Sequence, residues 1–283
     1  MVFRFLLFLL SATLLASRPT IAQINLETPR VESILYLGEG SDQPLIVGLG
    51  GSEGGNAWSS DYWKKTRDQF IARGYAFLAL GYFGAKGTPR ILNQIAIEDV
   101  HRAILTAARH PRVNRRRIAI IGGSRGADLA LLLGSYYKDI DCVVSIVGSN
   151  AVFPGHTLDY QTSCWTYKQK DLPFLPVDDD ALPFLAKRNL RAAFETMLRD
   201  SAALQQAAIP VEKIKGPILL VSATRDEVCP STPMADMMMQ RLREKGFRYT
   251  FEHRAIEGGH AAPLRHFDLI FAFLEKHFRS HIP

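Results

Sequence analysis

Continuous apolar runs alternate along the chain with segments whose apolar residues recur at helical spacing. The runs that predict strands are residues 44–51, 75–83, 117–123, 142–148, 217–223 and 247–256. The segments that predict helices are residues 57–74, 91–110, 126–137, 233–246 and 266–278. In the second of these, Ile97, Val100 and Ile104 follow the spacing of one buried helical face. The pattern predicts an α/β protein with a mostly parallel sheet and helices on both faces.

One stretch interrupts this alternation. Residues 151–215 are rich in proline, aspartate and aromatic residues, and they separate two of the apolar runs. That length is unusual for a simple connection. We expect an insertion, or lid, over the carboxyl edge of the sheet, where open α/β folds bind ligands. The alternative is that this segment is a surface loop without a role in binding.

The first 22 residues have the composition of a secretory signal peptide. Arg4 precedes an apolar run from Phe5 to Leu10 that continues through Leu14, Leu15 and Ala16, and Ala22 is a small residue at the expected cleavage site. The run is too short for a good membrane-spanning helix, which needs about 20 apolar residues. We expect residues 1–22 to be removed and residues 23–283 to form one exported domain, periplasmic or secreted, without a membrane span. An uncleaved anchor is the alternative.

Composition narrows the classes of function. The 283 residues are 47% hydrophobic and 22% charged, which is typical of a large globular domain. The formal net charge of +6 could suit nucleic acid, but the densest basic run, Arg115–Arg117, has no interleaved aromatic residues. We interpret this run as a solvated turn and expect no nucleic-acid partner.

The cysteines and short motifs give no sign of a metal or cofactor. Cys142 lies in a predicted buried strand, so we expect an inert thiol. Cys164 and Cys229 could pair in an exported protein, although three cysteines make no disulfide framework. No standard metal motif occurs, and the glycine loop at 48–55 fits no nucleotide-binding template. We predict no metal ion and no cofactor.

Two stretches match the G-x-S-x-G pattern of a nucleophilic serine, so the pattern alone selects neither. Residues 122–126 centre on Ser124, and residues 50–54 centre on Ser52. A nucleophile elbow needs a strand, a sharp turn and a helix, which together raise the serine hydroxyl above the sheet edge. Ser124 lies between a predicted strand and a predicted helix, whereas loop-forming residues follow Ser52. The context favours Ser124.

The other glycine cluster suits a second role in the same reaction. Attack on an acyl carbon creates an oxyanion that needs backbone N–H donors. In the α/β-hydrolase fold, one donor follows the nucleophile and another lies in an earlier strand-to-helix loop. The sequence therefore predicts an oxyanion hole from the amides of Arg125 and of Gly51 or Ser52.

Chain order selects the acid and the base. In this fold the order is serine, acid and histidine, with the acid and the histidine after successive strands. Asp226, with Glu227 as a neighbouring competitor, follows the run at 217–223, and His260 follows the last predicted strand. We predict that His260 takes the Ser124 proton, that Asp226 orients the imidazole, and that an acyl-enzyme forms on Ser124.

These stretches resemble the catalytic domain shared by acyl-CoA thioesterases and bile acid-CoA:amino acid N-acyltransferases. The similarity covers most of residues 32–278 and includes IVGLGGSEGG, YAFLALGYFG, HPRVNRRRIAIIGGSRGADLAL, IPVEKIKGPILLVSATRDEVCPSTPMAD and EGGHAAP. The resemblance implies an α/β-hydrolase fold with an insertion between strands 6 and 7. It also implies Ser124 as nucleophile, Asp226 as acid and His260 as base. Acyltransferase members tend to carry cysteine as the nucleophile, so the serine resembles the hydrolytic members.

Several features depart from that family. Its full-length members have an N-terminal β-sandwich domain, and we expect none here because roughly 20 residues separate the expected cleavage site from the strand at 44–51. Export would also separate the chain from cytosolic acyl-CoA. Cys229 stands where the family pattern has tryptophan. An ordinary ester, a lactone or an amide therefore stays open as the substrate.

The insertion supplies candidates for an acyl pocket. Its large apolar side chains are Phe153, Tyr160, Trp165, Tyr167, Phe174, Leu175, Phe184 and Leu185. We predict that Phe153, Tyr160 and Trp165 contact the substrate; the alternative is that the set forms the insertion's own core. The Arg125 side chain could meet an anionic substrate group or point outward from its helix.

The leading function is an exported serine hydrolase acting on a small-molecule acyl ester or thioester, similar to acyl-CoA thioesterases. An acyltransferase would pass the same acyl group to an amine or alcohol. A peptidase fits less well because no gating domain precedes the predicted hydrolase domain. A catalytically silent binding protein on this fold would usually lack one member of the triad, and all three residue types occur here.

Overall fold

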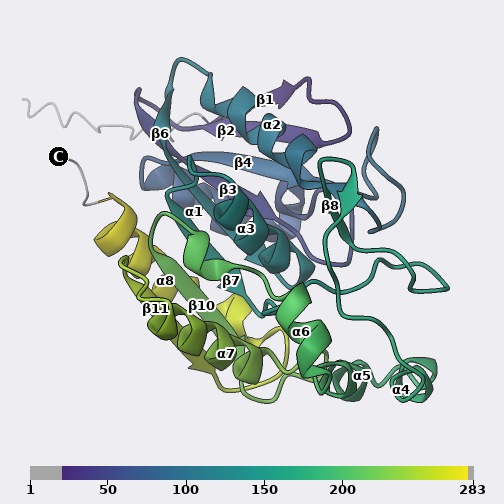
Figure 1. The fold of residues 1–283 in the computed structure, drawn as a ribbon. Helices are drawn as coiled ribbons and strands as arrows, with labels where there is room; N and C mark the ends of the chain where they lie inside the picture. The colour runs from purple at the N-terminus through teal and green to yellow at the C-terminus, as the bar shows by residue number, and fades with distance from the viewer. Residues whose placement is uncertain (1–20, 280–283) are drawn as a thin grey trace, which may run out of the picture.

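The computed structural model describes residues 21–279, and its centre is a sheet of eight strands (Figure 1). The strands lie in the order β1-β2-β4-β3-β6-β7-β10-β11. Their bounds are β1 Ala22–Leu26, β2 Glu32–Leu37, β3 Gln43–Leu49, β4 Ala76–Gly81, β6 Val113–Gly123, β7 Cys142–Ile146, β10 Ile218–Ala223 and β11 Phe251–Ile256. Each predicted strand forms one strand of this sheet, and the six run parallel from β4 to β11. The mostly parallel α/β architecture is therefore confirmed.

Two strands at one edge of the sheet are absent from the sequence prediction. β1 pairs antiparallel with β2, and β2 pairs antiparallel with β4. β1 alternates exposed and half-buried residues, so it lacks the continuous apolar run of a strand buried on both faces. Ala22 is the first residue of β1. The predicted signal peptide otherwise lies, apart from Ile21, outside the described residues.

Helices cover both faces of the sheet, as predicted. Their bounds are α1 Asp61–Ala72, α2 Ile97–Ala108, α3 Arg125–Tyr136, α7 Ser231–Glu244 and α8 Phe267–Leu274. Short turns η1 Ala57–Ser59, η3 Ala262–Arg265 and η4 Glu275–Arg279 adjoin them. On one face α2, α3 and α7 pack into a core that contains Ile104, Leu132 and Met238. On the other face α1 and α8 pack through Phe70 and Phe271.

The helix expected from residue 91 begins only at Ile97. The preceding residues Ile95–Ala96 form β5, which pairs with β8 (Trp165–Tyr167) in a separate small sheet. Gln94, at φ 50°, donates its N–H to the Ser163 carbonyl oxygen at 2.9 Å. The Ile95 N–H likewise donates to the Cys164 carbonyl oxygen at 2.8 Å, so both N–H groups bond to a segment far along the chain instead of starting a helix. Apolar periodicity cannot reveal such a partner, which is why the predicted start was wrong.

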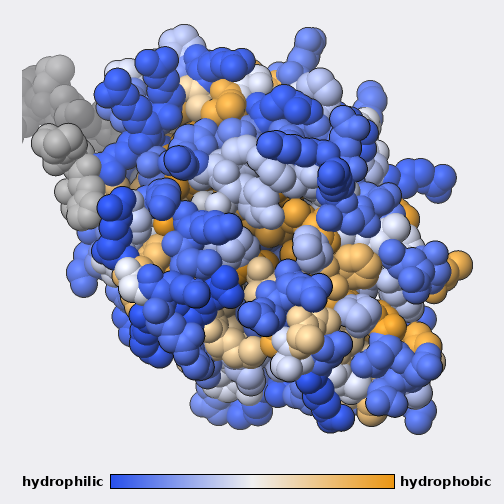
Figure 2. Space-filling model, viewed as in Figure 1, coloured by the Kyte–Doolittle hydropathy of each residue, from blue (hydrophilic) through white to orange (hydrophobic). Residues whose placement is uncertain are grey.

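The segment between β7 and β10 forms the predicted insertion, because these are the sixth and seventh strands of the large sheet in chain order. It contains β8, β9 Lys170–Asp171, α4 Leu182–Ala186, α5 Leu190–Met197, α6 Ser201–Ala207 and the turn η2 Val211–Lys213. A small core joins Phe153, Leu175 and Met197 to Met234 of α7. Exposed hydrophobic side chains gather over α4 and α5, at the lower right of Figure 2. They include Leu182, Phe184 and Leu190.

The cysteines are buried free thiols, so the possible Cys164–Cys229 disulfide is absent. Cys164 Sγ donates to the Pro154 carbonyl oxygen at 3.1 Å. Cys142 lies within β7 in the core, where we expected it. Within residues 21–279, no helix combines the length and the apolar character needed to cross a bilayer.

The start of α3 packs directly against the end of β3. A Cβ atom on Gly126 would lie 2.2 Å from the Gly50 carbonyl oxygen, and one on Gly122 would lie 2.0 Å from the Gly126 carbonyl oxygen. Only glycine allows these backbones to approach so closely. The approach also brings Gly51 next to Ser124, since a Cβ on Gly51 would lie 3.0 Å from the Ser124 Cβ.

We expect Gly126→Ala to lower the free energy of unfolding by on the order of 3 kcal/mol, because its methyl group would overlap backbone atoms that have no room to move. Gly123→Ala is the matched control, since its Cβ would meet no atom within 4 Å. Urea unfolding followed by circular dichroism measures both. Equal stabilities of the two variants would contradict the close approach.

Candidate active site

Ser124 occupies the turn from β6 into α3 in a backbone conformation that non-glycine residues rarely adopt. Its φ is 53° and its ψ is −123°. The Ser124 N–H donates to the Ile146 carbonyl oxygen at 2.8 Å, and the Ser124 carbonyl accepts from Ala127 N–H at 2.9 Å. These bonds hold a strained residue between strand and helix, as a nucleophile elbow requires. Ser52, by contrast, lies in the loop between β3 and η1.

The side chains of Asp226 and His260 meet where the chain leaves β10 and β11. His260 Nδ1 lies 2.9 Å from each carboxylate oxygen of Asp226. Asp226 is fully buried and also accepts from Val228 N–H at 3.0 Å, Cys229 N–H at 3.1 Å and the Ser231 hydroxyl at 2.6 Å. A ring that donates through Nδ1–H keeps Nε2 free to accept a proton.

The charge of Asp226 is held by its hydrogen bonds. Burial raises the pKa of this carboxyl, but hydrogen bonds from His260 and Ser231 lower it further, so the net pKa lies below the ordinary value. The group is therefore ionised at neutral pH. An ionised acid beside Nδ1 can orient the imidazole and stabilise its protonated form.

Glu227, the neighbouring acid, contacts the backbone instead of the ring. Glu227 Oε2 accepts the His260 backbone N–H at 2.9 Å. On the other side, Arg191 Nη1 donates to the Asp226 carbonyl oxygen at 2.6 Å. These two side chains fix the loops that carry the acid and the histidine. The geometry favours Asp226 as the orienting acid.

Backbone amides on two elements face the Ser124 turn. Arg125 is the first residue of α3, so its N–H has no acceptor within the helix, and the helix dipole favours negative charge there. On the facing loop, Gly51 N–H donates to Glu53 Oε1 at 3.0 Å. The Ser52 N–H makes no hydrogen bond within residues 21–279. Of the predicted oxyanion donors, Arg125 and Ser52 are therefore open, and an oxyanion at Gly51 would have to displace the Glu53 carboxylate.

A second serine, histidine and aspartate also contact one another, at the β10–β11 edge. Ser222 Oγ lies 2.7 Å from His253 Nε2, and His253 Nδ1 lies 3.1 Å from Asp236 Oδ1. Ser222 is buried inside a strand and shares its hydroxyl with Thr232 at 2.8 Å. None of these residues lines the cavity around Ser124. Without an elbow turn or a place for substrate, this set is a packing contact.

Asp226, Cys229 and His260 are the one group of described residues whose ligand atoms are close enough to share a metal ion, within 4.8 Å. A metal would need a thiolate there. Burial, followed by the nearby Asp226 charge, raises the pKa of the Cys229 thiol. The Asp226 oxygens already accept from two backbone amides, the Ser231 hydroxyl and His260, and the Cys229 thiol lies 3.8 Å from Oδ2. The donor set therefore fits an acid–base pair better than a metal centre.

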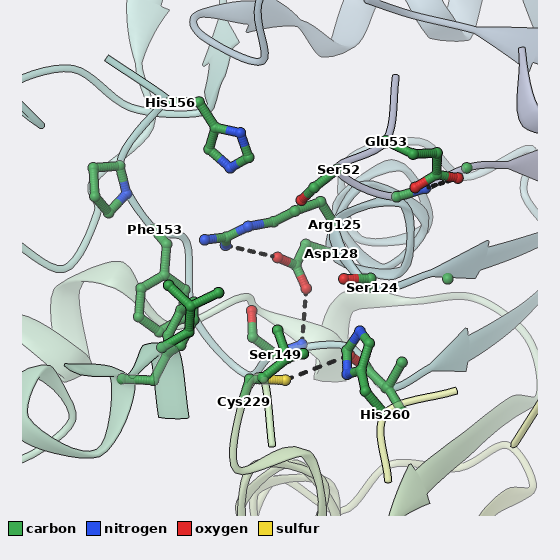
Figure 3. A pocket seen from close by; sticks show the side chains of 18 of the residues that line it. Ser52, Glu53, Ser124, Arg125, Asp128, Ser149, Phe153, His156, Cys229 and His260 are labelled. Atoms are coloured by element: carbon green, nitrogen blue, oxygen red, sulfur yellow. Dashed lines mark hydrogen bonds and ion pairs between the residues drawn. The ribbon is translucent and has the colours of Figure 1, made fainter. Parts of the chain in front are cut away.

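Ser124 and His260 face a common cavity of about 730 Å³ (Figure 3). Its walls are mostly apolar, and both the insertion and the body of the domain contribute to them. The insertion supplies Phe153, Tyr160, Val177, Leu185, Leu190, Phe194 and Met197, and the body supplies Trp58, Trp63, Ile146, Val147 and Leu264. A cavity of this size and character suits a small organic ligand.

The predicted pocket residues divide between the cavity and the core. Phe153 and Tyr160 line the cavity. Trp165 does not: it is fully buried in the main core, 5.8 Å from the Tyr82 ring, where β8 joins the insertion to β5. The expected contact of Trp165 with substrate is corrected accordingly. Leu175 belongs to the insertion's own core. Some of the large apolar residues of the insertion therefore line the cavity, and others form the core of the insertion.

Some residues of the site were missed in the sequence. Asp128 was detectable as a lone charge in an apolar helix, and it is almost fully buried beside the cavity. Ser231 was detectable as a hydroxyl at the start of the helix that follows Asp226. Glu53, Trp58 and Trp63 also line the cavity, but no sequence pattern distinguishes them from surface or core residues.

Comparisons with known proteins agree with this architecture. A family model described as BAAT / acyl-CoA thioester hydrolase C terminal matches residues 96–280. The chain is 29% identical over 238 residues to the peroxisomal succinyl-coenzyme A thioesterase of Mus musculus, and 27% identical over 232 residues to acyl-coenzyme A amino acid N-acyltransferase 1 of Mus musculus. Each alignment covers 81% of this chain and 51% of the relative, so the chain spans about half the length of these proteins.

Solved structures share the fold at low sequence identity. Pyrococcus horikoshii acylaminoacyl peptidase superposes with a TM-score of 0.65 at 16% identity, covering 93% of this chain and 42% of the peptidase. The Pyrococcus furiosus esterase Pf2001 superposes with a TM-score of 0.59 at 15% identity, covering 92% of this chain and 94% of the esterase. This likeness shows an α/β-hydrolase fold.

We expect Asp226→Asn to slow covalent labelling of Ser124 by a fluorophosphonate about 10³- to 10⁴-fold, because an amide cannot hold the imidazole in its productive tautomer. Glu227→Gln is the matched control: its amide oxygen can still accept the His260 N–H, so we expect a loss of less than about tenfold. Second-order labelling rates measure both variants. The reverse ranking would reassign the orienting acid to Glu227.

Proposed function

Since this chain belongs to the BAAT / acyl-CoA thioester hydrolase C-terminal family, we propose that it is a serine hydrolase that cleaves a thioester or ester bond. The family and the fold support hydrolase or acyltransferase activity. The observation that carries the proposal of a serine hydrolase is that a strained serine, Ser124, shares one cavity with a histidine, His260, whose ring is held by a buried carboxylate.

The proposed reaction has two halves, acylation of Ser124 and hydrolysis of the acyl-enzyme, and His260 acts as base and then as acid in each. His260 Nε2 removes the Ser124 proton as the hydroxyl attacks the acyl carbon. The amides of Arg125 and Ser52 receive the oxyanion. His260 then protonates the leaving thiol or alcohol, and the Ser124 acyl ester remains. Water, activated by His260, releases the acid and restores the serine.

Acyl transfer to an amine is the second candidate, and the 27% identity to an amino acid N-acyltransferase is the observation that favours it. The two activities share the acyl-enzyme and differ in the nucleophile that attacks it. Product analysis in the presence of glycine and taurine separates them: free acid supports the hydrolase, and an N-acyl amino acid supports the transferase.

The leaving group and the location are proposals as well. We propose a thioester or an ordinary small ester, because the apolar cavity walls suit an acyl chain and the relatives act on acyl-coenzyme A. We also propose export, on the pattern of Arg4, the apolar run and Ala22. N-terminal sequencing of the protein from its host tests export, since a start at Met1 would contradict it.

We expect a fluorophosphonate to label the wild type and Ser52→Ala and to leave Ser124→Ala unlabelled, because only the Ser124 hydroxyl has an activating base. Ser52→Ala is the matched control, since it removes the serine of the other G-x-S-x-G stretch and retains the backbone amide at position 52. Gel fluorescence followed by peptide mapping locates the label. A folded wild type that stays unlabelled would refute the serine mechanism and leave a binding protein.

A further inference from the structure

The Arg125 side chain enters the active-site cavity instead of pointing outward from α3. It is 12% exposed, and Arg125 is the sole lysine or arginine among the described residues that line the cavity. Desolvation, followed by the charge of Arg125, lowers the pKa of the neighbouring His156 to about 4. At neutral pH His156 is therefore uncharged, and the guanidinium is the fixed positive charge on an otherwise mostly apolar wall.

The guanidinium is clamped on several sides. Arg125 Nη1 donates to Asp128 Oδ2 at 3.2 Å, and Asp128 Oδ1 accepts the Ser149 N–H at 2.8 Å. The rings of Phe153 and Phe194 lie 5.1 and 5.4 Å from Arg125 Cζ. Within residues 21–279 the guanidinium makes no second hydrogen bond. Asp128 and the two rings thus orient the Arg125 guanidinium, and its other N–H groups have no acceptor among the described residues.

Such an arrangement needs a reason, because burying an ion pair costs free energy that apolar side chains would not cost. A guanidinium with several uncommitted donors binds a carboxylate in two parallel hydrogen bonds. The aromatic rings beside it exclude water and strengthen that interaction. An anionic substrate group is therefore the ligand that the geometry fits.

The direction of the side chain decides which part of the substrate carries the anion. His260 must protonate the leaving group, so the leaving group lies beside His260. In Figure 3 the Arg125 side chain extends away from His260, toward Phe153. The acyl chain of the substrate would therefore run toward the guanidinium.

We propose that Arg125 is a specificity-determining residue that binds the carboxylate at the far end of a dicarboxylic acyl group. The inference rests on the proposed function, because it places the scissile carbonyl at Ser124. Asp128 is the positioning residue that holds the guanidinium toward the cavity.

The first test compares two esters that differ only in the terminal carboxylate, 4-nitrophenyl hydrogen adipate and 4-nitrophenyl hexanoate. We expect Arg125→Met to lower the adipate-to-hexanoate ratio of kcat/KM by about 10- to 100-fold, since a charged hydrogen-bond partner is lost. Arg125→Gln, which retains polarity and most of the volume, should lower the same ratio. Equal losses with both esters would assign Arg125 to packing and overturn the proposal.

Arg102→Met is the matched control variant. Arg102 pairs with Asp99 three positions away on α2, but it is exposed and does not line the cavity. We expect this variant to keep the wild-type ratio. A second substrate pair, hexanoyl-CoA and the neutral hexanoyl-N-acetylcysteamine, tests the leaving group. A fall confined to this pair would place the anion on the leaving group and overturn the proposal.

A binding measurement separates this inference from the proposed function. Calorimetry on Ser124→Ala compares monomethyl adipate, which carries one carboxylate, with dimethyl adipate. We expect tighter binding of the monoester, and we expect Arg125→Met in the same background to remove the difference. That result without any wild-type hydrolysis would sustain the carboxylate site and reject the serine hydrolase. Hydrolysis by the wild type together with equal binding of the monoester and the diester would support the serine hydrolase and overturn the carboxylate site.

Discussion

The backbone turn at Ser124 is the constraint on which the rest of the site depends. Gly122 and Gly126 let β6 reverse into α3 while the loop after β3 lies against the turn. The same turn places Ser124 at φ 53°, leaves the Arg125 N–H at the start of α3 without a helical acceptor, and sends the Arg125 side chain into the cavity. One tight crossing thus fixes three features of the candidate site, and the strained Ser124 is held by one hydrogen bond to Ile146 of β7 and one to Ala127 of α3.

The pair of Asp226 and His260 is built independently of Ser124, at the ends of β10 and β11. Asp226 is held by two backbone amides and by the Ser231 hydroxyl, so its charge and direction do not depend on Ser124. His260 is fixed by its ring contact to Asp226 and its backbone contact to Glu227. Parallel strands bring their carboxyl ends to one edge, which is how segments more than a hundred residues apart come to face one cavity.

The sequence predicted those parts of the molecule whose signals are local. Continuous apolar runs marked the buried strands, and chain order brought Asp226 and His260 together correctly. It missed β1, whose alternating pattern is weak at a sheet edge, and it misplaced Trp165, whose partner Tyr82 lies far along the chain. Aromatic residues look alike in sequence whether they line a pocket or join two layers: Phe153 and Trp165 are both fully buried, and only Phe153 lines the cavity. The hydrogen bond from the Gly51 N–H to the Glu53 carboxylate likewise depends on the rotamer of Glu53, which no residue pattern predicts.

The proposed reaction requires that the acyl group passes through Ser124. The most direct measurement is intact-protein mass spectrometry of the enzyme quenched with acid during turnover of 4-nitrophenyl hexanoate, followed by peptide mapping. We expect a single hexanoyl adduct on Ser124 in the wild type and no adduct in His260→Gln, because that variant lacks the base that activates the serine. An adduct on Ser52, or consumption of the ester at the wild-type rate by Ser124→Ala, would contradict it.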